Sequence, residues 1–127
     1  MILDDLMYTE GHEWVDRTGD GTVKVGITDY RQGQLGEMVY VKFPEVGRKV
    51  TAGTAIGEVE STTSVTSICA PVRGEIVAVN DELDAQPDLI NSDPFGEGWI
   101  VELRPDAPES LKGLLDATGY RDRIGED

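Results

Sequence analysis

The stretch from residue 55 to residue 80 places the strongest constraint on the fold. Two β-rich runs, at 55–59 and 65–72, flank a tip of small hydroxylated residues, and a third run at 75–79 follows a proline and a glycine. Runs rich in β-branched residues on either side of a short polar segment are typical of a β-hairpin. The sequence therefore predicts a hairpin that carries its hydroxyl-rich tip into solvent.

Short β-prone runs also occupy much of the remaining chain. The dipeptide Asp20-Gly21 is the strongest hairpin signal, and it joins a β-prone segment at 6–15 to an alternating run at 22–27. Further strands are predicted at 38–43 and 99–103. Many short strands at close spacing, punctuated by glycine and proline, suggest a small barrel or sandwich.

Helical signals are few and short. Thr28 or the aspartate after it can cap a helix over 30–35, which Gly36 would stop. A proline suits the start of a helix over 108–116, and the leucines of that stretch recur at helical spacing. We expect this C-terminal helix to pack its leucines on a sheet.

Two other stretches are expected to lack regular structure. Residues 86–94 contain two prolines and several Asp and Asn residues, and at most a helical turn precedes them at 80–85. The charged stretch 122–127 is expected to fray.

The composition fits one soluble domain spanning residues 1–127. A chain of this length can bury a core without disulfides or a structural metal. Its 25 acidic and 11 basic residues give a formal net charge of −14, so nucleic acid and anionic membrane surfaces would be repelled. No apolar run approaches the roughly 20 residues that a membrane-spanning helix needs.

The number of cysteines and the N-terminal sequence both bear on the cellular compartment. Cys69 is the only cysteine, which rules out an intrachain disulfide and favours a reducing environment. The first residues are acidic and lack the basic, apolar and small-residue regions of a secretory signal. These features predict a cytoplasmic protein.

Common catalytic and metal-binding motifs are absent or incomplete. Residues 16–21 look like the start of a calcium loop, but Ile27 stands at the twelfth position in place of glutamate. No phosphate-binding glycine motif occurs, and with His12 and Cys69 as the only residues of their kinds no metal site is expected. A nucleophilic pair of Cys69 and His12 stays open. The alternative is a small buried Cys69 and a His12 with a surface or hydrogen-bonding role.

Motifs along nearly the whole chain resemble those of the glycine cleavage system H protein family. They occur in family order: His12-Glu13-Trp14-Val15, Gly26-Ile27-Thr28-Asp29, Leu35-Gly36-Glu37, Pro44-Glu45-Val46-Gly47, Gly57-Glu58-Val59-Glu60-Ser61, Ala70-Pro71-Val72, Gly74-Glu75-Ile76-Val77-Ala78-Val79-Asn80, Leu89-Ile90-Asn91-Ser92-Asp93-Pro94 and Gly98-Trp99. The resemblance implies a mainly β fold, a lipoyl-type barrel-sandwich hybrid (hammerhead) of two small antiparallel sheets with short flanking helices, including a C-terminal helix. This agrees with the strands predicted from the residues.

The resemblance implies a carrier rather than an enzyme. In the family, a lipoyl group on a hairpin lysine receives an aminomethyl group from the pyridoxal-phosphate-dependent P protein. The group passes to the folate-dependent T protein, and the flavin-dependent L protein reoxidises the arm. P, T and L proteins, and lipoate-attaching enzymes, are therefore the partners that the resemblance suggests.

The hairpin tip departs from the family where the cofactor is attached. The family usually has Ser-x-Lys-Ala-x-Ser-Asp here, and Thr63 stands at the lysine. Ser67 stands at the acidic residue and Cys69 at a usual aromatic, whereas Glu13 matches a retained cleft carboxylate. The lysines of the chain lie away from the tip: Lys24, Lys42, Lys49 and Lys112. No lipoate is therefore expected covalently on this chain.

Three interpretations follow for the candidate site. Its residues are Glu60, Ser61, Thr62, Thr63, Ser64, Ser67 and Glu13. The favoured interpretation is a non-lipoylated paralogue that acts through protein–protein interaction. The second is an H protein in which a parental lysine was replaced by engineering, and the third is a repurposed carrier or small enzyme that uses a tip hydroxyl or Cys69.

Overall fold

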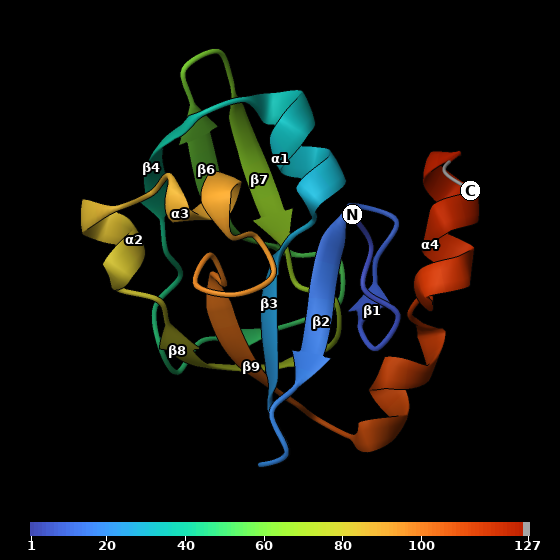
Figure 1. Cartoon of the computed structure of the whole chain (residues 1–127). Helices are drawn as coiled ribbons and strands as arrows, with labels where there is room; N and C mark the ends of the chain where they lie inside the picture. The colour runs from blue at the N-terminus through green and yellow to red at the C-terminus, as the bar shows by residue number, and fades with distance from the viewer. Residues whose placement is uncertain (126–127) are drawn as a thin grey trace.

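Two antiparallel sheets form the body of the protein (Figure 1), in a computed structural model that describes residues 1–125. The larger sheet has the strand order β1-β2-β3-β9-β8-β5 and the smaller has the order β4-β6-β7. The strands of the larger sheet are β1 (Met7–Tyr8), β2 (Glu13–Arg17), β3 (Val23–Ile27), β9 (Val101–Pro105), β8 (Gly74–Val79) and β5 (Lys49–Val50). Those of the smaller sheet are β4 (Met38–Lys42), β6 (Ala55–Ser61) and β7 (Val65–Cys69). The prediction of a mainly β chain with two antiparallel sheets is confirmed.

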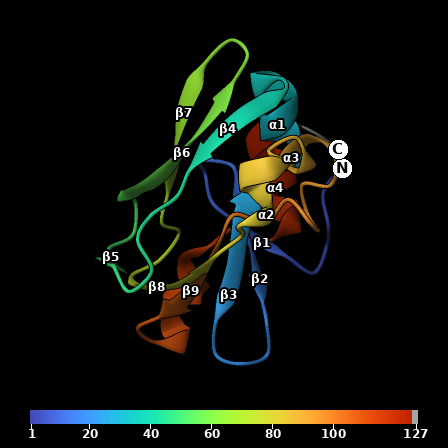
Figure 2. The same ribbon diagram turned by 90° about the vertical axis from the view of Figure 1, so that its left-hand side faces the viewer.

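The predicted hairpin is formed by β6 and β7. The two strands pair from Glu60 opposite Val65 at the tip to Ala55 opposite Cys69 at the base. The tip projects beyond the rest of the small sheet (Figure 2). The second strand ends at Cys69, earlier than the predicted run to residue 72, because Pro71 cannot donate to a strand ladder.

The first predicted helix and its end signals are confirmed. Helix α1 (Asp29–Leu35) begins after Thr28, whose hydroxyl accepts the backbone N–H of Arg31 at 3.3 Å. It ends at Gly36, which adopts a φ of 89° that a residue with a side chain rarely takes.

The C-terminal helix lies later in the chain than predicted. The stretch 108–116 contains only a 3₁₀ helix, η1 (Pro108–Gly113), whereas an α-helix, α4 (Ala117–Ile124), occupies part of the stretch expected to fray. Asp116 caps α4 by accepting the N–H of Gly119 at 2.7 Å. Tertiary packing of Tyr120, which is fully buried, explains why this weakly patterned segment is helical. The last two residues of the predicted frayed end lie outside the described residues.

Residues 86–94 also differ from the expectation. They contain a short helix, α3 (Leu89–Ser92). The helix before it, α2 (Glu82–Ala85), lies where a helical turn was predicted. Ile90 is fully buried, so contact with the core orders this segment despite the flanking prolines.

The core has two parts. The main cluster lies between the sheets and includes Val15, Met38, Ile68, Ile76 and Leu103. A second cluster packs α4 against β1 and contains Leu6, Tyr8, Trp14, Ala117 and Tyr120. Among residues 1–125, no helix combines the length and apolar character that crossing a membrane requires.

Candidate functional site

The hairpin tip is a turn organised by one buried hydroxyl. Ser61 is only 6% exposed, and its side-chain oxygen accepts the backbone N–H groups of Thr63 and Ser64 at 3.3 and 3.1 Å. The N–H of Ser61 donates to the carbonyl of Ser64 at 2.8 Å. Thr62, Thr63 and Ser64 are exposed. Ser61 therefore organises the turn from inside, and the next three residues form its solvent-exposed surface.

The tip also contacts the segment that follows α1. The N–H of Thr62 donates to the carbonyl of Glu37 at 3.1 Å. The hydroxyl of Thr63 donates to the carbonyl of Leu35 at 3.4 Å. These contacts fix the direction of the hairpin relative to the rest of the molecule.

Asn91 also holds the segment that follows α1. Its Oδ1 accepts the N–H of Met38 at 2.8 Å, and its Nδ2 donates to the carbonyl of Gly36 at 2.8 Å and to Gln32 Oε1 at 2.9 Å. A single α3 side chain thereby links α1, the post-helix segment and β4. Asn91 was not among the site residues predicted from the sequence. Its place in the motif at 89–94 that resembles the family was the feature that could have identified it.

We expect Asn91→Ala to loosen the hairpin tip. The substitution leaves the part-buried N–H of Met38 without its partner, which costs about 1–3 kcal/mol of unfolding free energy, and it leaves the exposed carbonyl of Gly36 to water. Amide hydrogen exchange at residues 62–64 should accelerate because the segment that receives the tip is no longer held. Ser92→Ala, on an exposed neighbour in α3, is the matched control. Equal exchange in both variants would show that Asn91 does not position the tip.

Glu13 lies at the base of the hairpin rather than at its tip. It is 5% exposed, and its Oε2 accepts the backbone N–H of Cys69 at 3.3 Å while its Oε1 accepts the hydroxyl of Thr9. The hydroxyl oxygen of Thr9 in turn accepts the N–H of Glu13 at 3.1 Å. The carboxylate is therefore held in place by the end of β7 and by the residues before β2.

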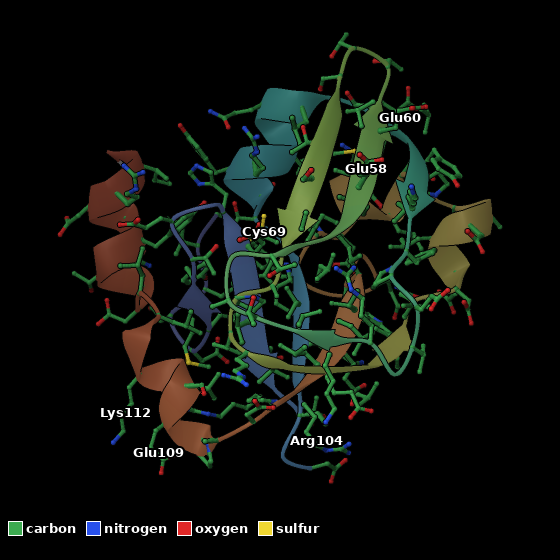
Figure 3. All side chains as sticks on the ribbon, turned by 180° about the vertical axis from the view of Figure 1, so that it is seen from behind. Glu58, Glu60, Cys69, Arg104, Glu109 and Lys112 are labelled. Carbon is green, nitrogen blue, oxygen red and sulfur yellow. The ribbon has the colours of Figure 1, made fainter. Side chains whose placement is uncertain are left out.

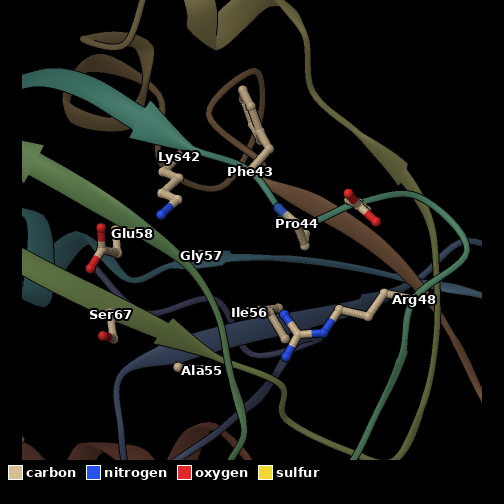
Figure 4. Close-up of a pocket in the computed structure, with 10 residues that line it drawn as sticks. Lys42, Phe43, Pro44, Arg48, Ala55, Ile56, Gly57, Glu58 and Ser67 are labelled. Carbon is tan, nitrogen blue, oxygen red and sulfur yellow. The ribbon is translucent and has the colours of Figure 1, made fainter.

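Ser67 and Glu60 occupy positions between the tip and the base. Ser67 is paired with Glu58 and lines a cavity of about 380 Å³, together with Lys42 and Arg48 (Figure 4). Glu60 is exposed and lies nearer the tip than Glu58 on the same strand. Among the described residues, no hydrogen bond or ion pair joins Glu13 to Ser67 or to the tip. The candidate residues therefore form a tip group, 60–64, and two separate positions below it.

Cys69 and His12 do not form a nucleophilic pair. Nδ1 of His12 lies 2.9 Å from the hydroxyl of Tyr120, and the nearby ionisable group of Cys69 is Glu13. Burial, with a smaller contribution from the Glu13 carboxylate, raises the pKa of the Cys69 thiol. Cys69 is half-buried, so the alternative of a small buried cysteine describes it only in part. Among the described residues, no group of three or more His, Cys, Asp and Glu is placed to hold a metal ion.

The raised pKa of Cys69 predicts a slow thiol. Alkylation by iodoacetamide at pH 8 should be slower than for a cysteine in an unstructured peptide, because less thiolate is present. Glu13→Gln removes the neighbouring negative charge and should raise the rate, whereas Glu60→Gln should not change it. A wild-type rate equal to that of the peptide would contradict the assigned environment.

The sequence is similar to those of known proteins over nearly its whole length. Residues 6–127 match the glycine cleavage H-protein family. The glycine cleavage system H protein of Mycolicibacterium smegmatis is 58% identical over 125 residues, which cover 96% of this chain and 95% of the relative. The corresponding protein of Mycobacterium bovis is 49% identical over 131 residues and 98% of each chain.

A solved structure extends the agreement to three dimensions. The crystal structure of a glycine cleavage system H protein from Mycobacterium marinum has a TM-score of 0.88 to this chain at 41% identity. The match covers 98% of this chain and 99% of that one. Sequence and fold therefore agree over nearly the entire length, and the chain belongs to the glycine cleavage H-protein family.

Proposed function

We propose that this chain is a non-lipoylated member of its family that acts by binding proteins of the glycine cleavage system. The observation that carries the proposal is Thr63, an exposed threonine at the tip where the family presents its lipoyl-lysine. The chain would act as one domain over residues 1–127, in the cytoplasm, without performing catalysis. Its partners would be the P, T and L proteins or relatives of them.

The residues present do not fit covalent attachment of lipoate. A lipoyl amide needs a side-chain amine on a long, flexible stem, and the tip offers only the short hydroxylated side chains of Thr62, Thr63 and Ser64. Lys42 lines the cavity below the tip, and Nζ of Lys24 lies 4.6 Å from the ring centre of Trp99. The other two lysines belong to β5 and η1. None of these amines can substitute for one at residue 63.

Hydrogen bonds hold the tip of this chain in place. Ser61 organises the turn, and Glu37 and Leu35 receive the residues after it. Asn91 then fixes the receiving segment. A tip held in one orientation by these contacts is suited to recognition by a partner protein even without a group on residue 63.

A covalent role for Thr63 or Cys69 has less support. The polar contacts of the Thr63 hydroxyl are the Leu35 carbonyl and, at 3.5 Å, the hydroxyl of Ser61, and neither is a base that could activate it. The raised pKa of Cys69 disfavours its nucleophilic thiolate. An engineered loss of lysine would be recognised by a lysine at position 63 of a parental sequence.

Direct binding tests the proposal. The purified chain is immobilised and exposed separately to P, T and L proteins, and a parallel sample is analysed for covalent adducts after trapping. We expect reversible binding to at least one of the three and no adduct at Thr63 or Cys69. Binding to none of them would overturn the proposed function, and a trapped adduct would favour the covalent alternative.

A further inference from the structure

A β-bulge exposes two consecutive apolar side chains beside the hairpin tip. In the pairing of β4 with β6, Met38 lies opposite Ser61 and Tyr40 opposite Glu60, so Val39 is an extra residue. Met38 is buried, whereas Val39 and Tyr40 are 47% and 55% exposed. A regular strand would turn one of these two side chains inward. The bulge instead presents both to solvent, as bulges at functional sites do.

A row of side chains extends this exposed surface across the small sheet. Tyr40 pairs with Glu60, and Glu60 pairs with Val65. Directly opposite residues in antiparallel strands share one face of a sheet. Val65 is 57% exposed, so Tyr40 and Val65 flank Glu60 on the outer face. We refer to Val39, Tyr40, Glu60 and Val65 as the tip-side patch.

The exposed apolar side chains of this protein are concentrated in the patch. Among the described residues the large hydrophobic side chains with substantial exposure are Met1, Tyr30, Val39, Tyr40, Val46 and Val65. Half of them belong to the patch. Isolated exposed hydrophobic residues need no explanation, but a contiguous group marks an interaction surface. Tyrosine in particular is enriched at the centres of protein interfaces.

The charges around the patch indicate the chemistry of its partner. Glu60 lies within it, and exposed Glu37 precedes β4. Glu58, two residues before Glu60 on β6 (Figure 3), lies opposite exposed Lys42, so the charge of Glu58 is balanced locally whereas those of Glu60 and Glu37 belong to the patch and its edge. The formal net charge of −14 adds a negative field over the molecule. A complementary surface would have an apolar centre and a rim of lysine and arginine.

We propose that the tip-side patch is the docking surface for such a basic-rimmed protein partner. The inference rests on the proposed function, because it assigns the surface through which binding to a P, T or L protein would occur. Docking beside the tip requires no group on Thr63, so it remains available in a chain without the lipoyl-lysine.

The test compares patch variants with a matched control in the same binding measurement. Tyr40→Thr combined with Val65→Thr removes the apolar contacts and places threonine, a residue favoured in strands, at both positions. Val46→Thr, on a side chain 60% exposed in the loop between β4 and β5, is the control. We expect the double variant to weaken binding of the partner by at least about tenfold and the control to leave it unchanged. Glu60→Lys should also weaken binding, and added salt should reduce the wild-type affinity.

Each result distinguishes the patch from the proposed function. If the wild type binds a partner and the patch variants bind equally well, the patch assignment is overturned and the proposed function stands. If the wild type binds none of the three proteins, both are overturned. Self-association of the wild type that the double variant abolishes would assign the patch to a second copy of the chain and would also overturn the inference. Circular dichroism and thermal unfolding of each variant ensure that the comparison is between folded proteins.

Discussion

Replacing Tyr120 with alanine is expected to lower the free energy of unfolding by about 3–5 kcal/mol, the range for truncating a buried aromatic side chain. Tyr120 is fully buried on α4, and its ring stacks on Tyr8 of β1 with a centroid distance of 4.6 Å and an interplanar angle of 8°. Removing the ring leaves a cavity between α4 and the larger sheet. Chemical denaturation followed by circular dichroism measures the change.

The hydroxyl of Tyr120 connects this cluster to the start of α1 and to His12. It lies 2.7 Å from the hydroxyl of Thr28, which caps α1, and 2.9 Å from Nδ1 of His12. Tyr120→Phe keeps the stacked ring but removes both contacts, so we expect a smaller loss of about 1–3 kcal/mol. If the alanine and phenylalanine variants lost equal stability, the packing of the Tyr120 ring would not contribute to the free energy of unfolding, and the prediction would be contradicted.

The same hydroxyl predicts a pH dependence in the alkaline range. Burial raises the pKa of Tyr120 from its ordinary value of 10.0 to about 12. In the folded state the proton is held more tightly than in the unfolded state, so its contribution to stability is complete below pH 10. That contribution is lost as the pH rises through 12. Tyr120→Phe should flatten the fall in unfolding free energy between these two pH values.

Replacing Thr63 with lysine is expected to convert the chain into a substrate for lipoate-attaching enzymes. The new amine would stand at the tip, where the backbone turn is organised by Ser61 and held against Glu37. Thr63 is exposed and its side chain makes only two long hydrogen bonds, at 3.4 and 3.5 Å. The stability change should therefore stay within about 0.5 kcal/mol. Mass spectrometry of the tip peptide after co-expression measures the modification.

Ser64→Lys provides the positional control for that gain. It places an equivalent amine on the next exposed residue of the same tip, but shifts its direction because successive residues around the turn point differently. We expect attachment to the residue 63 variant and little or none to the residue 64 variant. Equal modification of both would mean that the geometry of the tip does not determine acceptance.

Local signals in the sequence predicted the parts of the fold that local chemistry controls. The hairpin at 55–69 follows from β-branched runs around a hydroxylated turn, and α1 follows from Thr28 at its start and Gly36 at its end. The tip position of Thr63 came from the family resemblance, and the hairpin in the structure agrees with it. These features depend on residues close together in the chain.

Features that depend on distant contacts were missed or misplaced. Helix α4 forms because Tyr120 stacks on Tyr8, more than a hundred residues earlier, and not because its own sequence is strongly amphipathic. The bulge at Val39 breaks the alternation of β4, which is set by its register with β6. Asn91 acquires its role from backbone groups of the segment after α1. No local pattern contains this information.

The mass of the unaltered chain after co-expression with lipoate-attaching enzymes tests the central claim most directly. The Thr63→Lys variant, expressed in parallel, shows that enzyme and lipoate are active and that the tip is recognised. We predict that the unaltered chain keeps the mass of its sequence while the variant gains one lipoyl group. A lipoyl increment on the unaltered chain, at Thr63 or at any of its lysines, would contradict the account.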